Sequence, residues 1–268
     1  MKTLFAWANP LAGVSIVDHT WVTDYDITET NYTKPPPDRN YWYCWGDYHS
    51  KAASGGVGEA IGDISIASSL AKPNDPPPEF PGKPKTPQDG AIIYYAIDGV
   101  CHSVCNQILY ATGSPDSHPL RVTAAKGYSF SSFFYGTYGL NHHDWDLLKA
   151  TCGTVKDPGD DFDRLLKESL GDELTLKQHL EVYACRGLAQ VSLQGLRSRV
   201  HMLTPQQIKE RIGLTIFAAF FAVEKAIGFE NFKVLFPPFS SMPSDWHEAI
   251  SWLDHNMLEH SILTQQGN

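Results

Sequence analysis

The sequence predicts an α+β fold in which an antiparallel sheet packs against one helix and a helical layer follows. Segments rich in aromatic and β-branched residues fill the first part of the chain, a helix signal begins at Cys101, and helical periodicity dominates after residue 140. A chain of 268 residues is near the upper size of a single domain. We therefore expect one elaborated domain, with the sheet and the Cys101 helix in residues 1–140 and the helical layer in residues 141–268.

Strand signals come first along the chain. Residues 4–8, 15–25 and 41–48 are rich in Val, Ile, Thr, Trp and Tyr, and Asn-Pro and Pro-Pro-Pro turn signals separate them. We expect these segments to pair in one antiparallel sheet.

Glycine and proline dominate the next part of the sequence. Residues 55–62 resemble a phosphate-cradling loop, but no clear strand precedes them and no lysine ends them, so we expect a flexible segment. Residues 72–89 combine many prolines with charge, which a sheet or helix interior cannot accommodate. These residues are expected to form an exposed loop.

A strand, a tight turn and a helix are predicted next. Residues 90–97 have the composition of a buried strand, and Asp98-Gly99 indicates a turn into a helix over residues 101–112 that closes at Gly113. Farther along, residues 122–124 (Val-Thr-Ala) are expected to be a strand. Residues 128–135 are also expected to be a strand, because aromatic and serine residues alternate there.

The second half has helical patterns. Apolar residues recur at spacings of three and four over residues 162–170, 174–203, 205–227 and 246–262. Thr204-Pro205 is typical of a helix start, with threonine as N-cap and proline in the first helical position.

Cys101 is the candidate nucleophile because it opens its predicted helix after a glycine turn. Free backbone N–H groups at a helix start lower a thiol pKa and can bind an oxyanion. Cys105 lies one turn deeper and is expected to be structural. The same helix places both cysteines on an apolar stripe, so a core role for Cys101 stays open.

A cysteine nucleophile needs a base, and His19 on a predicted strand is the best candidate. Strand alternation places His19 on one face with Trp21 and Thr23, which points it inward if that face is the core. The next strand offers Asp47 and His49 to orient the imidazole, and we prefer Asp47. The predicted catalytic set is therefore Cys101, His19 and Asp47.

Two segments resemble permuted papain-like cysteine peptidases and amidases, in which the histidine strand precedes the nucleophile. They are Asp-His-Thr-Trp-Val at 18–22 and Asp-Gly-Val-Cys-His at 98–102. The resemblance implies a hydrolase or acyl transferase that acts on an amide, ester or thioester, with a peptide or small amide or ester as substrate. It covers the first half of the chain only, and proline-rich insertions depart from the pattern.

Two other classes of function remain open. Cys101, His102 and Cys105, together with His142-His143, could supply the ligands of a metal-dependent enzyme, but their spacing matches no standard zinc motif. We therefore expect no metal and no cofactor. Alternatively, the chain is a non-catalytic binding protein or a toxin-related interaction protein on the same scaffold.

Charge and cysteine content restrict partners and compartment. A net charge of −9 without a basic run argues against nucleic acid and anionic membranes as partners. Five cysteines, an odd number, fit free thiols in a reducing compartment. The apolar run at the N-terminus is broken by Asn9 and Pro10 before a signal-peptide core develops. We expect a cytoplasmic protein, or one exported without a cleavable signal peptide.

Overall fold

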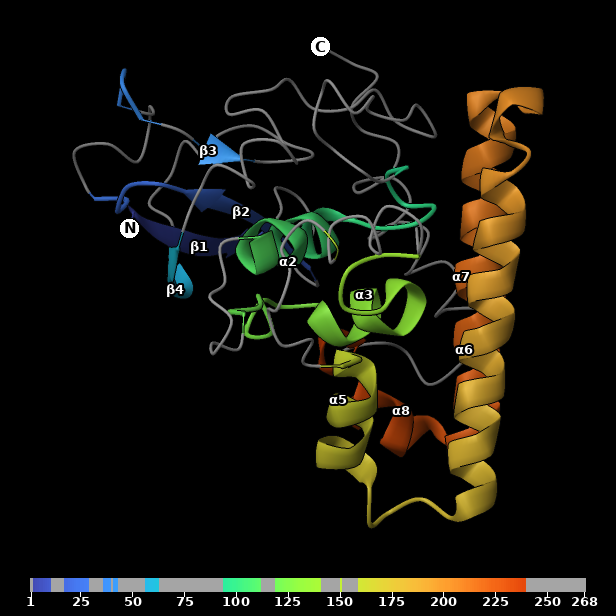
Figure 1. The fold of residues 1–268 in the computed structure, drawn as a ribbon. Coiled ribbons are helices and arrows are strands. Elements are labelled where there is room, and N and C mark those ends of the chain that lie inside the picture. Colours follow the sequence, from blue (N-terminus) through green and yellow to red (C-terminus); the bar gives the residue numbers. More distant parts are fainter. Residues whose placement is uncertain are drawn as a thin grey trace.

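An antiparallel sheet and a set of α-helices give this protein the predicted α+β architecture (Figure 1). The computed structural model describes residues 2–10, 17–28, 36–39, 41–42, 56–62, 94–111, 119–140, 150 and 159–239. The strands are β1 (Lys2–Pro10), β2 (Asp18–Thr23), β3 (Tyr41–Trp42) and β4 (Gly56–Gly62). The helices are α2 (Cys101–Ala111), α3 (Tyr128–Tyr135), α5 (Asp161–Leu170), α6 (Leu176–Arg197), α7 (Pro205–Ile227) and α8 (Phe229–Leu235).

The sheet has the strand order β3-β2-β1-β4, with every neighbouring pair antiparallel. Its two faces are occupied differently. Ala6 of β1 pairs with Val22 of β2, and both belong to the main core that also contains residues of α2. Trp7 pairs with Trp21 on the other face, where the two rings form a small separate cluster. The three strands predicted first along the chain are thus present where the structure describes them, although it describes only Tyr41–Trp42 of the predicted strand 41–48. Side-chain alternation gives each face of the sheet a distinct apolar layer.

The expectation of a flexible segment over residues 55–62 is wrong, because Gly56–Gly62 forms β4 along the free edge of β1. Glycine has a low strand propensity, which made this segment look like a loop. Its backbone hydrogen bonds come from β1, more than forty residues earlier in the chain. The residues around 56–62 therefore carry no signal for a pairing with a strand so far away in the sequence.

The predicted strand over residues 90–97 is also wrong in its described part, which begins at Tyr94. A tight turn replaces it, in which the Ala96 N–H donates to the Gly99 carbonyl at 2.7 Å and the Asp98 N–H donates to the Tyr94 carbonyl at 3.0 Å. Ala96 has a φ of 60°, an unusual value for alanine. The buried Asp98 carboxylate stabilises this turn, since it accepts from the Tyr94 N–H and pairs with Arg197.

Tyr128–Tyr135 is helix α3, not a strand, and residues 122–124 contain a turn, not a strand. The aromatic residues of this segment fit either periodicity, because almost all of its side chains are buried. Gly127, with a φ of 82°, ends the preceding turn in a conformation that favours glycine. Contacts with α5 and α6 then favour the helix.

Helices α5, α6 and α7 agree with the expected ones, except that α6 ends at Arg197 and a separate 3-10 helix, Val200–Met202, follows it. Helix α8 was not predicted. Thr204 caps α7 and Thr175 caps α6, each through a reciprocal pair of bonds with a glutamine three residues later. The expected helix over residues 246–262 and the proline-rich segment over residues 72–89 lie outside the described residues.

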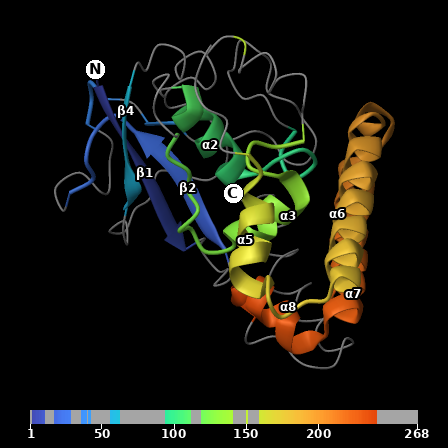
Figure 2. The ribbon, with the colours of Figure 1, turned by 60° about the horizontal axis from the view of Figure 1, so that its bottom comes forward.

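The sheet and the α6–α7 hairpin lie at opposite ends of the molecule, with α2, α3, α5 and α8 between them (Figures 1 and 2). One continuous core of buried residues runs from Leu4 of β1 through α2 and α3 to Phe236 after α8. The hairpin contacts α3 and α8, and Arg197 at the end of α6 pairs with Asp98 of the turn before α2.

Within the described ranges, no single helix is long and apolar enough to span a membrane. Helices α7 and α8 meet the length and composition criteria only when taken together, and a bend of 120° separates them.

Candidate functional site

Cys101 is the first residue of α2, as the sequence predicted, and it follows the Tyr94–Val100 turn directly. Helix α2 lies against β2, and every residue of the helix is buried. The Cys101 thiol points to the strand, with its Sγ 3.8 Å from the Asp18 carbonyl oxygen. Only 6% of the residue is exposed, so its thiol is packed between helix and strand.

This packing changes the expected chemistry of the thiol. Burial raises the pKa of Cys101 above its ordinary value, and this effect exceeds the lowering by hydrogen bonds from Thr20, His102 and Tyr95. The expectation of a lowered thiol pKa at the helix start is therefore corrected. Burial likewise raises the pKa of the Cys105 thiol, one turn farther along α2.

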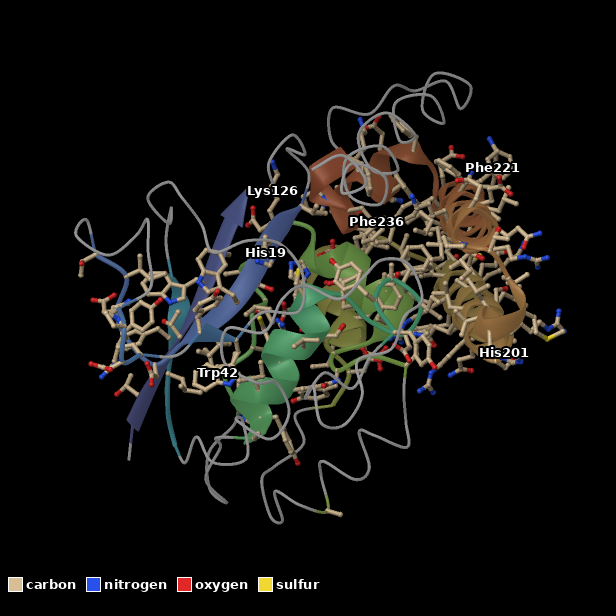
Figure 3. The ribbon with its side chains drawn as sticks, turned by 90° about the horizontal axis from the view of Figure 1, so that it is seen from above. His19, Trp42, Lys126, His201, Phe221 and Phe236 are labelled. Carbon is tan, nitrogen blue, oxygen red and sulfur yellow. The ribbon has the colours of Figure 1, made fainter. Side chains whose placement is uncertain are left out.

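The structure does not bring His19 to Cys101. Neighbouring Thr20 faces α2, because it hydrogen-bonds to Cys101 and Cys105. Since adjacent strand residues point to opposite faces, His19 faces away from α2. There its ring stacks on Trp21, with the ring centroids 5.5 Å apart. Figure 3 shows His19 on β2.

His102 is the histidine that lies beside the Cys101 thiol. Its Nε2 is 3.1 Å from the Asp18 carbonyl oxygen, the same acceptor that Cys101 approaches, and its Nδ1 is 2.7 Å from Ser131 Oγ. A carbonyl only accepts, so Nε2 carries the proton. The single Ser131 hydroxyl proton can be donated to Nδ1 or to the Tyr128 carbonyl, 3.0 Å away, and not to both.

The His102 ring is buried and neutral. Burial lowers the pKa of His102 to about 4, more than the bond to the Asp18 carbonyl raises it. The sequence offered His102 only as a possible zinc ligand. Its neighbour Ser131 lies in a segment expected to be a strand, and it reaches the imidazole from helix α3.

Asp47 lies outside the described residues, as do His49, His142 and His143. In the ranges that the structure describes, no three His, Cys, Asp or Glu side chains are grouped so that they could hold a metal ion.

A second candidate site is an apolar surface on the α6–α7 hairpin, here named the outer face. Its residues are large and apolar, with exposed fractions between 46% and 76%. They are Leu176, Leu180, Leu188 and Val191 of α6 and Leu214 and Phe221 of α7. Figure 3 shows Phe221 pointing away from the molecule, whereas Phe236 lies in the interior.

The outer face of α6 lies opposite the side that packs on the protein. The packed side consists of Val182, Arg186, Ala189, Leu193 and Leu196, at spacings of three and four. Leu180, Leu188 and Val191 project to the other side of the same helix. Helix α6 is therefore apolar on two opposite sides, which is not the pattern of an ordinary surface helix.

No protein family model, curated protein or solved structure matches this chain. The likeness of residues 18–22 and 98–102 to papain-like cysteine peptidases therefore stays a prediction from the sequence.

Proposed function

We propose that this chain is an interaction protein that binds a protein helix through the outer face of its α6–α7 hairpin. The exposed apolar side of α6, opposite its packed side, carries this proposal. Contiguous exposed apolar surface on a globular protein marks an interaction site, whereas single exposed apolar residues do not.

The apolar residues of the two helices lie at the same level of the hairpin. Gln178 Nε2 donates to the Ala226 carbonyl at 3.3 Å, which fixes the antiparallel register of α6 against α7. In this register Leu188 and Val191 of α6 lie at the level of Leu214 of α7. We therefore take these three exposed residues as the centre of the outer face.

Charged residues are missing from the middle of the hairpin, where residues 187–192 of α6 are level with residues 212–217 of α7. Neither stretch contains Asp, Glu, Lys or Arg, and neighbouring Arg186 is directed inward to Asp160 and the Phe133 carbonyl. Six helical residues extend about 9 Å, enough for an apolar contact where two helices cross. Burying one leucine side chain contributes about 1.5–3 kcal/mol, so a few such residues give useful affinity.

Cysteine-dependent acyl transfer is the second candidate function, on the observation that Cys101 is the first residue of α2. In this reaction, a Cys101 thiolate would attack an amide, ester or thioester carbonyl, with His19 as the base. Such a reaction requires the thiol to become exposed and a base to approach it. The first proposal needs neither rearrangement.

Photocrosslinking in the native cell tests the first proposal. A photoreactive amino acid replaces Leu188, and the matched control replaces Glu168, an exposed residue of α5. We expect covalent adducts at Leu188 and far fewer at Glu168, with the attached chain identified by mass spectrometry. Equal adduct yields at the two positions would contradict the proposal.

A further inference from the structure

We infer that the occupant of the outer face is a second copy of this chain, whose hairpin packs antiparallel to the first. This inference rests on the proposed function and names its partner. The two hairpins would form a four-helix contact around a two-fold axis, so that each outer face covers the other.

Charge at the two ends of the hairpin supports this arrangement. Residues 171–181, which enclose the start of α6, contain three acidic residues and one basic residue. Residues 198–211, at the opposite end, contain three basic residues and one acidic residue. The exposed members include Asp172 and Glu173 at the first end and Arg199 and Arg211 at the second.

An antiparallel second copy places the acidic end of one hairpin beside the basic end of the other. A parallel copy would place like charges together, which is unfavourable. At the centre of the contact, the uncharged residues 187–192 and 212–217 of one hairpin meet the same residues of the other, so no charge is buried there. The same chain is therefore complementary to itself in charge and in apolar surface.

Two glycines of α6 make no close packing contact with the part of the chain that the structure describes. A Cβ atom added at Gly187 or Gly195 would meet no atom within 4 Å. A glycine inside a helix costs about 1 kcal/mol relative to alanine, and neither glycine lies on the packed side of α6. Small residues beside Leu188 and Val191 allow a second helix to approach closely.

Sedimentation equilibrium of the full chain tests the inference. We expect a dimer at about 100 μM chain, where a micromolar dissociation constant leaves little monomer. The double substitution Leu188→Asp and Val191→Asp should raise the dissociation constant at least tenfold, because it buries charge in the contact. Ser169→Asp, at an exposed position of α5 and off the hairpin, is the matched control.

Charge exchange tests the antiparallel orientation. Arg199→Glu with Arg211→Glu should weaken the dimer, and adding Asp172→Lys with Glu173→Lys should restore it. A wild-type chain that stays monomeric overturns the inference, as does a dimer whose affinity is unchanged by all of these substitutions. If photocrosslinking at Leu188 captures only a different protein, the inference fails and the proposed function stands. If no adduct forms there, both fail.

Discussion

Cys101 and His102 are adjacent residues whose side chains approach the same carbonyl oxygen, that of Asp18. Both are almost fully buried, and burial favours the neutral form of each. The thiol pKa rises and the imidazole pKa falls. At neutral pH the two groups form an uncharged hydrogen-bonded contact between α2, α3 and β2, and this contact has the properties of a structural core.

The raised thiol pKa predicts slow alkylation of Cys101. In the native protein at neutral pH, Cys101 and Cys105 should react with iodoacetamide at least tenfold more slowly than Cys185, which is only half-buried. Peptide mapping by mass spectrometry measures each rate. Rapid labelling of Cys101 at mildly acidic pH would indicate a lowered pKa and would favour the cysteine-dependent hydrolase.

The lowered pKa of His102 predicts acid destabilisation. Between pH 6.5 and about 4 the unfolded chain binds a proton at this imidazole and the folded chain does not, so stability falls as the pH falls. The free energy of unfolding falls by about 3 kcal/mol over this range, and below the folded-state pKa this contribution no longer changes with pH.

Urea unfolding at a series of pH values measures this loss. His102→Gln removes the titrating group, so the variant should lose less stability than the wild type over the same pH range. His201→Gln, on an exposed 3-10 helix, controls for the loss of an imidazole. An equal pH dependence of wild type and His102→Gln would contradict the burial of a neutral His102.

At the scale of elements, local signals decide where the long helices begin. Thr204 accepts from the Gln207 N–H at 3.2 Å, and the Gln207 side chain accepts from the Thr204 N–H at 2.9 Å. This reciprocal pair of hydrogen bonds satisfies two backbone N–H donors at the start of α7. Pro205, in the first helical position, has no backbone N–H and so leaves no donor without an acceptor there. The start of the helix is therefore encoded in four consecutive residues.

Removal of the cap should shorten or weaken α7. Thr204→Ala is expected to lower the free energy of unfolding by about 1 kcal/mol, since it leaves the Gln207 N–H without its acceptor. Thr204→Ser keeps a hydroxyl at this position and is the control. The midpoints of urea unfolding compare the variants, and an unchanged midpoint for Thr204→Ala would show that the cap contributes nothing to stability.

At the scale of the whole molecule, Asp161 joins elements from both halves of the chain. Its carboxylate accepts from Tyr128 Oη at 2.6 Å and pairs with Arg121 at 3.1 Å, and Tyr128 Oη accepts in turn from Asn106 of α2. Helices α2, α3 and α5 meet at this carboxylate. The side chain is 1% exposed, so it is screened little by water.

Asp161→Ala should therefore destabilise the protein by about 3 kcal/mol or more, because Arg121 and the Tyr128 hydroxyl lose a buried partner. Asp163→Ala is the matched control on the same helix. Asp163 is 57% exposed and 3.6 Å from Arg186, so its loss should cost less than about 1 kcal/mol. Similar losses for both variants, measured by chemical unfolding, would contradict a special role for Asp161.

The sequence by itself determined the elements whose signals are local. The bounds of α7, the start of α2 at Cys101 and the strand character of β1 and β2 all follow from caps, turns and periodicity within a few residues. The α+β class followed from the order of these elements. Each of these features depends on residues that lie within a few positions of it in the sequence.

Only the tertiary structure decided the features whose partners are distant in the chain. Segment 56–62 is a strand because β1 offers it an edge, and Tyr128–Tyr135 is a helix because α5 and α6 pack against it. The Cys101 thiol is buried because β2 covers it, while His19 faces the opposite side of that strand. Burial, pKa and side-chain direction depend on atoms brought together by folding, and a linear pattern does not specify which atoms those are.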